Sequence, residues 1–303
     1  MFRLRPARAW VLACLCLLAG FRYLAAAPVT LTGADKVEVS VDNPRRLVVF
    51  NPSTYEILEE LGEAARVVGA DSGTYAVIPG AAEKGLANFG HHALPSIEAV
   101  IAANPDLILA NGDVLQPAVP TQLRSAGLSL LMLEHYDFDG IAGLKRRVAM
   151  VAAAVGREPE GRALIQRIDT RFAALQKANA RITKPKRVFF LYAYGSAIYG
   201  GTAGSHQLIE FAGAQDAASS ITGIKSISPE ALVAAAPDTL IMMQRAVGFI
   251  GGVDQIWELP GVALTPAGRN HAVVVIDDGA VFIGPRFLDH IEQLHRDLYP
   301  DAK

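Results

Sequence analysis

The stretch SIEAVIAANPDLIL, residues 96–109, recurs in the second half of the chain as SPEALVAAAPDTLI, residues 228–241. The two copies align without a gap and pair Ser96 with Ser228, Glu98 with Glu230, Pro105 with Pro237 and Asp106 with Asp238. Two unrelated Ala-rich helices that each stop at Pro-Asp would explain part of this likeness. However, each copy also leads into an apolar run and follows an opening with a basic residue and apolar neighbours. The repeat therefore indicates two lobes with related topology.

Short runs rich in Val, Ile and Leu surround the two copies and alternate with helix-like segments. They lie at residues 46–51, 66–70, 106–110 and 128–134 in the first half, and at 187–192, 239–243 and 271–277 in the second. Strands that are apolar at every residue are covered on both faces, which is typical of parallel sheets in α/β proteins. The pattern predicts two lobes, each a mainly parallel sheet flanked by helices.

A long amphipathic segment separates the two sets of strands. Pro159 is suited to the first turn of a helix, and Pro185 ends the run. Between them Leu164, Ile165, Ile168, Phe172 and Leu175 recur at helical spacings. A helix over 159–180 would be roughly 33 Å long, about the breadth of a domain. We expect an N-terminal lobe at 28–157, a connecting helix at 158–183 and a C-terminal lobe at 184–303.

Residues 1–27 have the three parts of a secretory signal peptide. Three arginines without an acid precede the apolar run VLACLCLLAG, and small residues follow in LAAA. A membrane anchor is disfavoured because this run is shorter than the roughly 20 residues that a bilayer requires. A lipoprotein signal ending at Cys14 is disfavoured because most of the apolar core follows that cysteine. We therefore expect cleavage and a periplasmic protein.

Removal of this segment limits what the mature chain can do. Both cysteines, Cys14 and Cys16, would be lost, which leaves no disulfide and no thiolate site. Four of the 28 Lys and Arg residues would also be lost, so the net charge falls to near −6 and disfavours nucleic acid. The chain contains no G-x-S-x-G, H-E-x-x-H or C-x-x-C motif. These observations favour binding over catalysis, with no catalytic cofactor.

The chain resembles the class III periplasmic substrate-binding proteins of ABC importers, the group that carries haem, cobalamin and iron siderophores. The likeness covers the opening RLVVFNPSTYEILEELGEAARVVGADS, both S-x-E-A repeats, the connecting helix and the closing GVDQIWELPGVALTPAGRNHAVVVID. The second half is most similar to the haem-binding branch, in GGTAGSHQLIEFAGAQDA, SISPEALVAAAPD and IGPRF. The resemblance implies two lobes that face each other across a ligand cleft, with limited hinge motion.

The resemblance also implies a partner and a cargo. In this family one acidic residue on each lobe meets arginines of the membrane permease, and the matching positions here are Glu98 and Glu230. A carboxylate at a helix start is also favoured by the helix dipole alone. The implied function is delivery of haem to the permease by a monomer. An iron siderophore or a corrinoid is the alternative cargo, and a secreted metal-binding protein or enzyme is a further alternative.

The sequence FGHHALPS, residues 89–96, holds the candidate iron ligand. Haem-binding relatives carry G-Y-M-R before the first repeat helix, and its tyrosine reaches the iron. Gly90, His91, His92 and Ala93 match these four positions in turn. An imidazole is a competent axial ligand, so the resemblance implies His91 as the ligand. His92 is a further ligand-binding candidate. The alternatives are two exposed histidines on a turn, or a transition-metal ion held by both rings and a third group. Adjacent histidines rarely point the same way, which disfavours the metal ion.

The opposite wall of the cleft is expected from LYAYGSAIYGGTAGSH, residues 191–206. Tyr199 is the candidate for a second axial or stacking contact, and its alternative is an aromatic side chain packed in the core. Tyr75, Tyr136 and Arg245 are further ligand-binding candidates at expected strand ends or loops. An anionic siderophore would need cationic partners, for which Arg245 and Arg286 are available.

Overall fold

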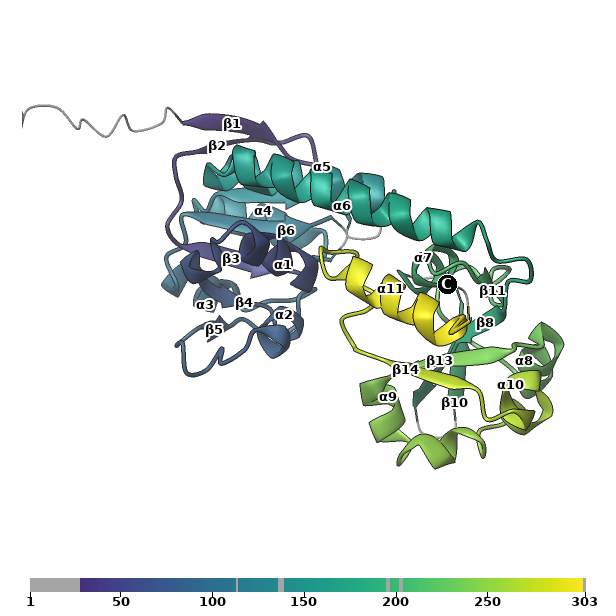
Figure 1. Ribbon diagram of the computed structural model, residues 1–303. Coiled ribbons are helices and arrows are strands. Elements are labelled where there is room, and N and C mark those ends of the chain that lie inside the picture. Colours follow the sequence, from purple (N-terminus) through teal and green to yellow (C-terminus); the bar gives the residue numbers. More distant parts are fainter. Residues whose placement is uncertain (1–27, 113, 136–138, 195–196, 202–203, 302–303) are drawn as a thin grey trace, which may run out of the picture.

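The first lobe is a five-stranded parallel sheet with helices on both faces (Figure 1). The computed structural model describes residues 28–301 except 113, 136–138, 195–196 and 202–203. The strand order is β5 (Ala87–Asn88), β4 (Val67–Ala70), β3 (Leu47–Phe50), β6 (Leu107–Asn111) and β7 (Leu130–Leu133). The helices are α1 (Pro52–Glu60), α2 (Ser72–Val77), α3 (Ile97–Ala102), α4 (Ala118–Ser125) and α5 (Gly140–Val155). An antiparallel hairpin of β1 (Val29–Thr32) and β2 (Glu38–Val41) precedes them.

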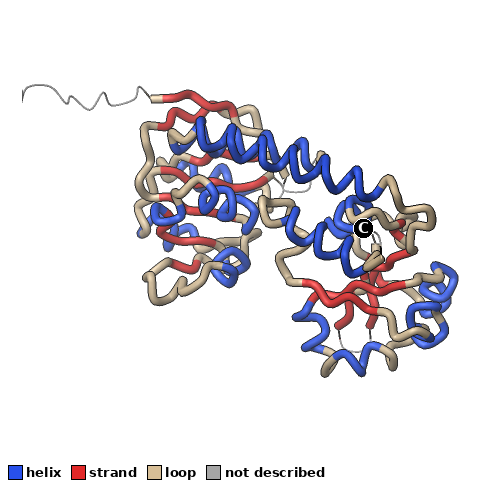
Figure 2. The backbone as a smooth tube through the Cα atoms, in the orientation of Figure 1, coloured by secondary structure: helices blue, strands red, loops and turns tan. Residues whose placement is uncertain are grey.

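The second lobe combines a parallel sheet with a small antiparallel one. The parallel order is β11 (Gln215–Asp216), β8 (Arg187–Phe190), β13 (Thr239–Met243) and β14 (Val273–Ile276). The antiparallel order is β12 (Lys225–Ser226), β10 (Ala197–Gly200) and β9 (Tyr192–Tyr194). The helices are α7 (Gly204–Phe211), α8 (Pro229–Ala235), α9 (Gln244–Phe249), α10 (Pro266–Arg269) and α11 (Phe287–Leu298). Figure 2 shows that helices flank the strands of both lobes.

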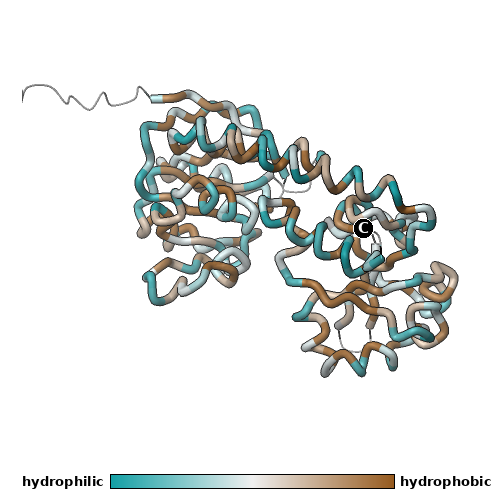
Figure 3. The backbone as a smooth tube through the Cα atoms, in the orientation of Figure 1, coloured by the Kyte–Doolittle hydropathy of each residue, from teal (hydrophilic) through white to brown (hydrophobic). Residues whose placement is uncertain are grey.

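The strands predicted from apolar runs are confirmed, and so is the fold class. Every residue of β3 and β6 is buried, as expected for central strands covered on both faces. Both sheets appear in Figure 3 with hydrophobic strands inside more polar helices. In Figure 1 the carboxyl ends of each parallel sheet point toward the other lobe. Residues that follow β4, β5 and β13 therefore lie on the sides of the lobes that face each other.

The two repeat copies fold and are held in the same way. Ser96 and Ser228 cap α3 and α8, and each hydroxyl accepts a hydrogen bond from a backbone N–H at 3.2 Å. At the other end, the Arg46 and Arg187 guanidinium groups each donate to a last-turn carbonyl at 2.6 Å. The carboxylates of Asp106 and Asp238 accept from the N–H groups of the same two arginines, at 2.9 Å each. These shared contacts explain why both copies carry the aspartate, and why Arg46 precedes β3 and Arg187 begins β8.

The predicted connecting helix is α6, which extends from Glu158 to Asn179. Leu164, Ile168 and Leu175 are buried, and Ile165 and Phe172 pack against the same core. The helix runs from one lobe to the other along the edge of the molecule (Figure 1). No helix in the described part of the chain has both the length and the apolarity needed to cross a membrane.

A second chain crossing, which the sequence did not indicate, also joins the lobes. After β14 the segment 277–286 returns to the first lobe before α11 begins. Its Ile283 is buried, and the Ile283 carbonyl accepts from the buried Arg147 guanidinium of α5 at 2.6 Å. One hydrophobic core contains residues of both lobes, among them Leu47, Ile57 and Phe190. A shared core resists separation of the lobes. The limited hinge motion stays a prediction.

Gly284 in this crossing segment is expected to tolerate no side chain. A Cβ atom there would clash with Glu56 Oε2 and would lie 3.0 Å from Ser53 Cα. We expect Gly284→Ala to lower the free energy of unfolding by about 1–3 kcal/mol, the usual cost of overpacking. Urea unfolding would measure it. The matched control is Gly248→Ala, where a Cβ meets no atom within 4 Å. Equal stability of Gly284→Ala and wild type would show that this contact between the lobes is loose.

Candidate functional site

Buried polar side chains line the carboxyl edge of the first sheet. Asn51, Asp71 and Asn111 follow or end three neighbouring strands and are each less than 5% exposed. Asn111 Oδ1 accepts from the Thr54 hydroxyl at 2.8 Å, and Asn51 N–H donates to Thr74 Oγ1 at 3.1 Å. Because each of these groups has a hydrogen-bond partner, the edge is rigid enough to support the loop above it.

The Asp71 carboxylate caps helix α2. Its Oδ2 accepts from the N–H groups of Gly73 and Thr74 at 3.0 and 3.3 Å, and its Oδ1 accepts from the Thr74 hydroxyl. Such a cap satisfies N–H groups at the helix start that have no partner within the helix. The carboxylate is therefore fixed in place beside the loop that contains the two histidines.

The two histidine rings lie against each other. Their centroids are 4.1 Å apart, and the ring planes differ by 33°. The expectation that these adjacent rings point apart is therefore wrong. The turn at Gly90, with φ of +86°, is fixed against α2 by a hydrogen bond from the Ser72 N–H to the Gly90 carbonyl at 2.8 Å. His91 is exposed, whereas His92 is partly buried and its Nδ1 lies 3.9 Å from Asp71 Oδ2.

The surroundings of His92 favour its neutral form. Burial lowers the pKa of the His92 imidazole, and the neighbouring His91 lowers it further, while Asp71 acts in the opposite direction. A neutral imidazole keeps a lone pair on one ring nitrogen, which is the form that binds metals. His92 can thus offer a nitrogen ligand near neutral pH. Among the described residues no group of three His, Cys, Asp or Glu side chains is arranged to hold a metal ion.

The other predicted ligand-binding residues do not contact the histidine rings. Tyr75 lies in α2 and packs partly against the core, and Tyr199 lies in β10 opposite Tyr192 and Ser226. Arg245 is exposed at the start of α9, and its N–H donates to Asp278 at 3.1 Å. None of these three makes a hydrogen bond, ion pair or ring contact with either histidine in the described structure. Tyr136 lies outside the described residues.

Glu98 and Glu230 occupy equivalent exposed positions, in the first turns of α3 and α8. Hydrogen bonds from its own N–H and from the Ser228 side chain lower the pKa of Glu230. Glu98 Oε2 lies 3.5 Å from the Ser96 hydroxyl. Neither glutamate forms an ion pair within the described chain. Each lobe therefore presents one carboxylate that an external cation can reach.

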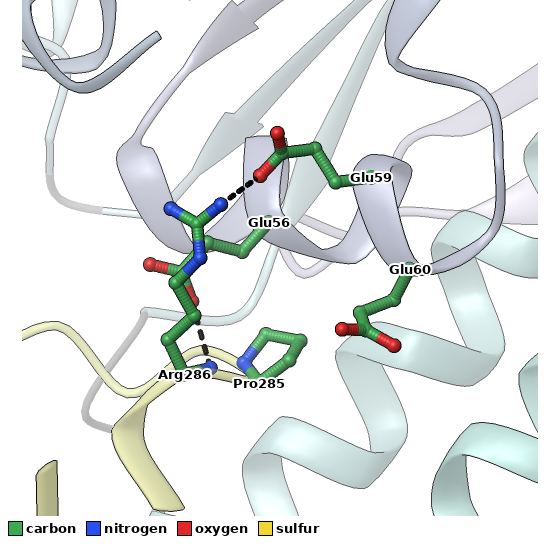
Figure 4. A pocket seen from close by; sticks show the side chains of 5 residues that line it. All are labelled: Glu56, Glu59, Glu60, Pro285 and Arg286. Carbon is green, nitrogen blue, oxygen red and sulfur yellow. Dashed lines mark hydrogen bonds and ion pairs between the residues drawn. The ribbon is translucent and has the colours of Figure 1, made fainter. Parts of the chain in front are cut away.

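A pocket at the junction of the lobes was missed by the sequence analysis. It has a volume of about 270 Å³ and is lined by Glu56, Glu59, Glu60, Pro285 and Arg286 (Figure 4). The Arg286 guanidinium pairs with Glu59, and the Arg286 N–H donates to Glu56 Oε2 at 3.1 Å. Arg286 thus holds the crossing segment against α1. The sequence suggested that Arg286 could pair with an anionic ligand, but in the structure its guanidinium pairs with Glu59. Two further pockets are lined by other elements, and none of the three includes a histidine of the pair.

Glu56 is the unusual group of this pocket. Burial raises the pKa of its carboxyl to about 7, and the N–H and charge of Arg286 only partly offset that effect. Glu56 Oε2 contacts Arg286, 230 positions away, so the neighbours of Glu56 in the chain gave no signal of this contact. Gly284 and Arg286 both belong to the IGPRF motif, residues 283–287.

Comparison with known proteins supports the resemblance. The periplasmic binding protein family model matches residues 47–280. The uncharacterized ABC transporter substrate-binding lipoprotein YvrC of Bacillus subtilis is 27% identical over 289 residues, which cover 91% of this chain and 87% of YvrC. A cobalamin-binding protein of Halobacterium salinarum is 29% identical over 224 residues, which cover 71% of this chain and 58% of that protein.

Solved structures agree with this family. The periplasmic heme-binding protein RhuT from Roseiflexus sp. RS-1, in apo form, superposes with a TM-score of 0.78 and 31% identity. The match covers 86% of this chain and 99% of RhuT. The two-lobed architecture and the resemblance drawn from the repeats are thereby confirmed. The chain, with its paired parallel sheets and its family match over most of its length, belongs to the periplasmic binding protein family.

Proposed function

We propose that this protein carries haem to an ABC permease and that a histidine of the His91–His92 pair ligates the iron. Members of this family are the substrate-binding components of ABC importers. They lie in the periplasm or outside the cell and work with the permease subunits of the importer. The observation that carries the haem proposal is the imidazole pair at the carboxyl edge of the first sheet. The likeness to a haem-binding protein at 31% identity supports it.

A corrinoid is the second candidate cargo. It is supported by the likeness to the cobalamin-binding protein of Halobacterium salinarum, and an imidazole can ligate cobalt as well as iron. An anionic siderophore has less support, because Arg286 is engaged with Glu59 at the lobe junction. The two supported cargoes differ in size, charge and absorbance, so parallel titrations with each of them can separate the two proposals.

Titration with ferric hemin tests the proposal. We expect a saturable Soret band with a histidine-type visible spectrum, and loss of that spectrum in a His91→Ala, His92→Ala double variant. Lysozyme serves as an inert protein that accounts for nonspecific haem adsorption. Cyanocobalamin, titrated in parallel, is expected to produce no saturable change. Saturation by cyanocobalamin and not by hemin would replace the haem proposal with the corrinoid one.

A further inference from the structure

The two stacked imidazoles differ in the contact that each Nδ1 atom makes. His91 Nδ1 accepts a hydrogen bond from the backbone N–H of Ala93 at 3.3 Å. A neutral imidazole has one protonated nitrogen and one with a free lone pair. Since Nδ1 of His91 is the acceptor, the ring proton lies on Nε2. The Nε2 atom of His91 then has no lone pair for a metal, and its Nδ1 lone pair is already used.

His92 has the opposite arrangement. Its Nδ1 lies 3.9 Å from the Asp71 carboxylate, whose side chain is only 2% exposed. A carboxylate beside Nδ1 favours the proton on that nitrogen and leaves the lone pair on Nε2. Histidines that bind metals usually donate their second ring N–H to such a partner, which fixes the tautomer and raises the basicity of the ligand. A shift of about 1 Å brings the two atoms to hydrogen-bonding distance.

We infer that His92 is the iron ligand, through Nε2, and that Asp71 is the positioning residue that sets its tautomer. The inference rests on the proposed haem-binding function and deepens it. The sequence resemblance implied His91, because that residue matches the tyrosine of the related motif. The contacts of the two rings favour its neighbour instead. His91 stacks on His92 and restricts the movement of the ligating ring.

The surroundings of Asp71 support a positioning role. Its two oxygens already accept from Gly73, Thr74 and the Thr74 hydroxyl, so the carboxylate cannot turn away from His92 without breaking the cap of α2. A cap alone is satisfied equally well by Asn or Ser at this position. The negative charge beside an imidazole is therefore the feature of Asp71 that capping does not require.

The test compares ferric hemin with iron-free protoporphyrin IX in four proteins: wild type, His91→Ala, His92→Ala and Asp71→Asn. We expect His92→Ala to lose the histidine-type spectrum and His91→Ala to retain it. Asp71→Asn should weaken hemin binding by about 10- to 100-fold, the usual effect of removing a partner of a metal ligand. Binding of protoporphyrin IX, which has no iron, should change much less in Asp71→Asn and His92→Ala. In a fifth protein, His92→Gly, added imidazole should restore the spectrum.

Resonance Raman spectroscopy of the ferrous complex supplies a readout that a purely structural role would not change. The iron–histidine stretching band should be present in wild type and His91→Ala, absent in His92→Ala, and at lower frequency in Asp71→Asn. The frequency falls because an imidazole without the carboxylate is a weaker donor. If Asp71→Asn does not fold, Asp71→Ser keeps a capping oxygen and replaces it.

Two kinds of failure are distinguishable. If wild type binds neither hemin nor protoporphyrin IX, the haem proposal itself fails. If wild type binds hemin but His91→Ala loses the band while His92→Ala keeps it, the assignment to His92 is overturned. Retention of the band in both single variants would also overturn it, and an unshifted band in Asp71→Asn would remove the role of Asp71.

Discussion

A variant with both Glu98→Ala and Glu230→Ala is expected to bind its cargo with wild-type affinity and to support no uptake above background. We propose that each carboxylate meets arginines of the permease, one on each lobe. The two groups are exposed, lie at equivalent positions of the repeat and have no cationic partner within the described chain. Loss of two such contacts should weaken docking by at least about a thousandfold.

The alternative role of these glutamates predicts a different result. If they only stabilise the starts of α3 and α8 through the helix dipole, their removal would slightly lower stability and leave uptake unchanged. The Ser96 and Ser228 caps remain in the double variant, so the helices are expected to form. Uptake by cells that express the cognate permease, together with a hemin titration, separates the two roles.

The matched control removes one exposed carboxylate from each lobe elsewhere, with Glu38→Ala on β2 and Asp297→Ala on α11. This control keeps the net charge equal to that of the test variant and should transport normally. Undiminished uptake by the Glu98→Ala, Glu230→Ala protein would reject the docking proposal. Loss of uptake in both double variants would point to total charge rather than to these two positions.

The fold could be predicted from the sequence because its main signals are local. Strands apolar at every residue, such as β3 and β6, have no other stable location than the centre of a covered sheet. The repeat could be predicted because its caps, Ser96 and Ser228, directly precede the helices that they fix, and because Arg46 and Arg187 lie at the starts of β3 and β8. The bonds from these arginines to the ends of α3 and α8 cross 57 and 48 positions and gave no signal in the sequence. The connecting helix α6 could be predicted equally well, since its buried residues recur at helical spacing.

The candidate site could be predicted from the sequence only in part, because its chemistry depends on contacts between distant segments. The sequence identified the histidine pair but not the carboxylate of Asp71, which comes from another strand end 21 positions before His92. It also could not show which ring nitrogen accepts a hydrogen bond. Arg286 illustrates the same limit: its charge suggested a role in ligand binding, whereas its contacts with Glu56 and Glu59 join the two lobes.

The second large effect concerns the buried Glu56 at that junction. Its pKa in the folded protein is raised from 4.5 to about 7, so the folded state binds a proton more tightly than the unfolded state. For a raised pKa, the stabilising contribution is complete below pH 4.5 and is lost as the pH rises through 7. We therefore expect Glu56→Gln to gain stability relative to wild type across this window, by about 3 kcal/mol in total. Urea unfolding at several pH values would measure the difference.

Comparison with the variant is necessary because other groups titrate with the opposite sign. Burial lowers the pKa of His92 and His290, so both lower the stability of the folded state as the pH falls through about 6.5. These contributions are present in wild type and in Glu56→Gln alike and cancel in the difference. Glu83→Gln, at an exposed position of the first lobe, is the control for loss of one negative charge.

The groups that face Glu56 determine how the result is interpreted. Arg286 donates its N–H from the crossing segment, and the negative charges of Glu59 and Asp289 raise the Glu56 pKa. The Gln side chain retains an oxygen that can accept the Arg286 N–H, so the variant changes the charge and not the contact. A difference that grows between pH 4.5 and 7 would mean that the lobe junction is most stable when Glu56 is protonated. A difference independent of pH would mean that water in the adjoining pocket solvates the carboxylate, and that the junction depends on packing at Gly284 and Ile283 alone.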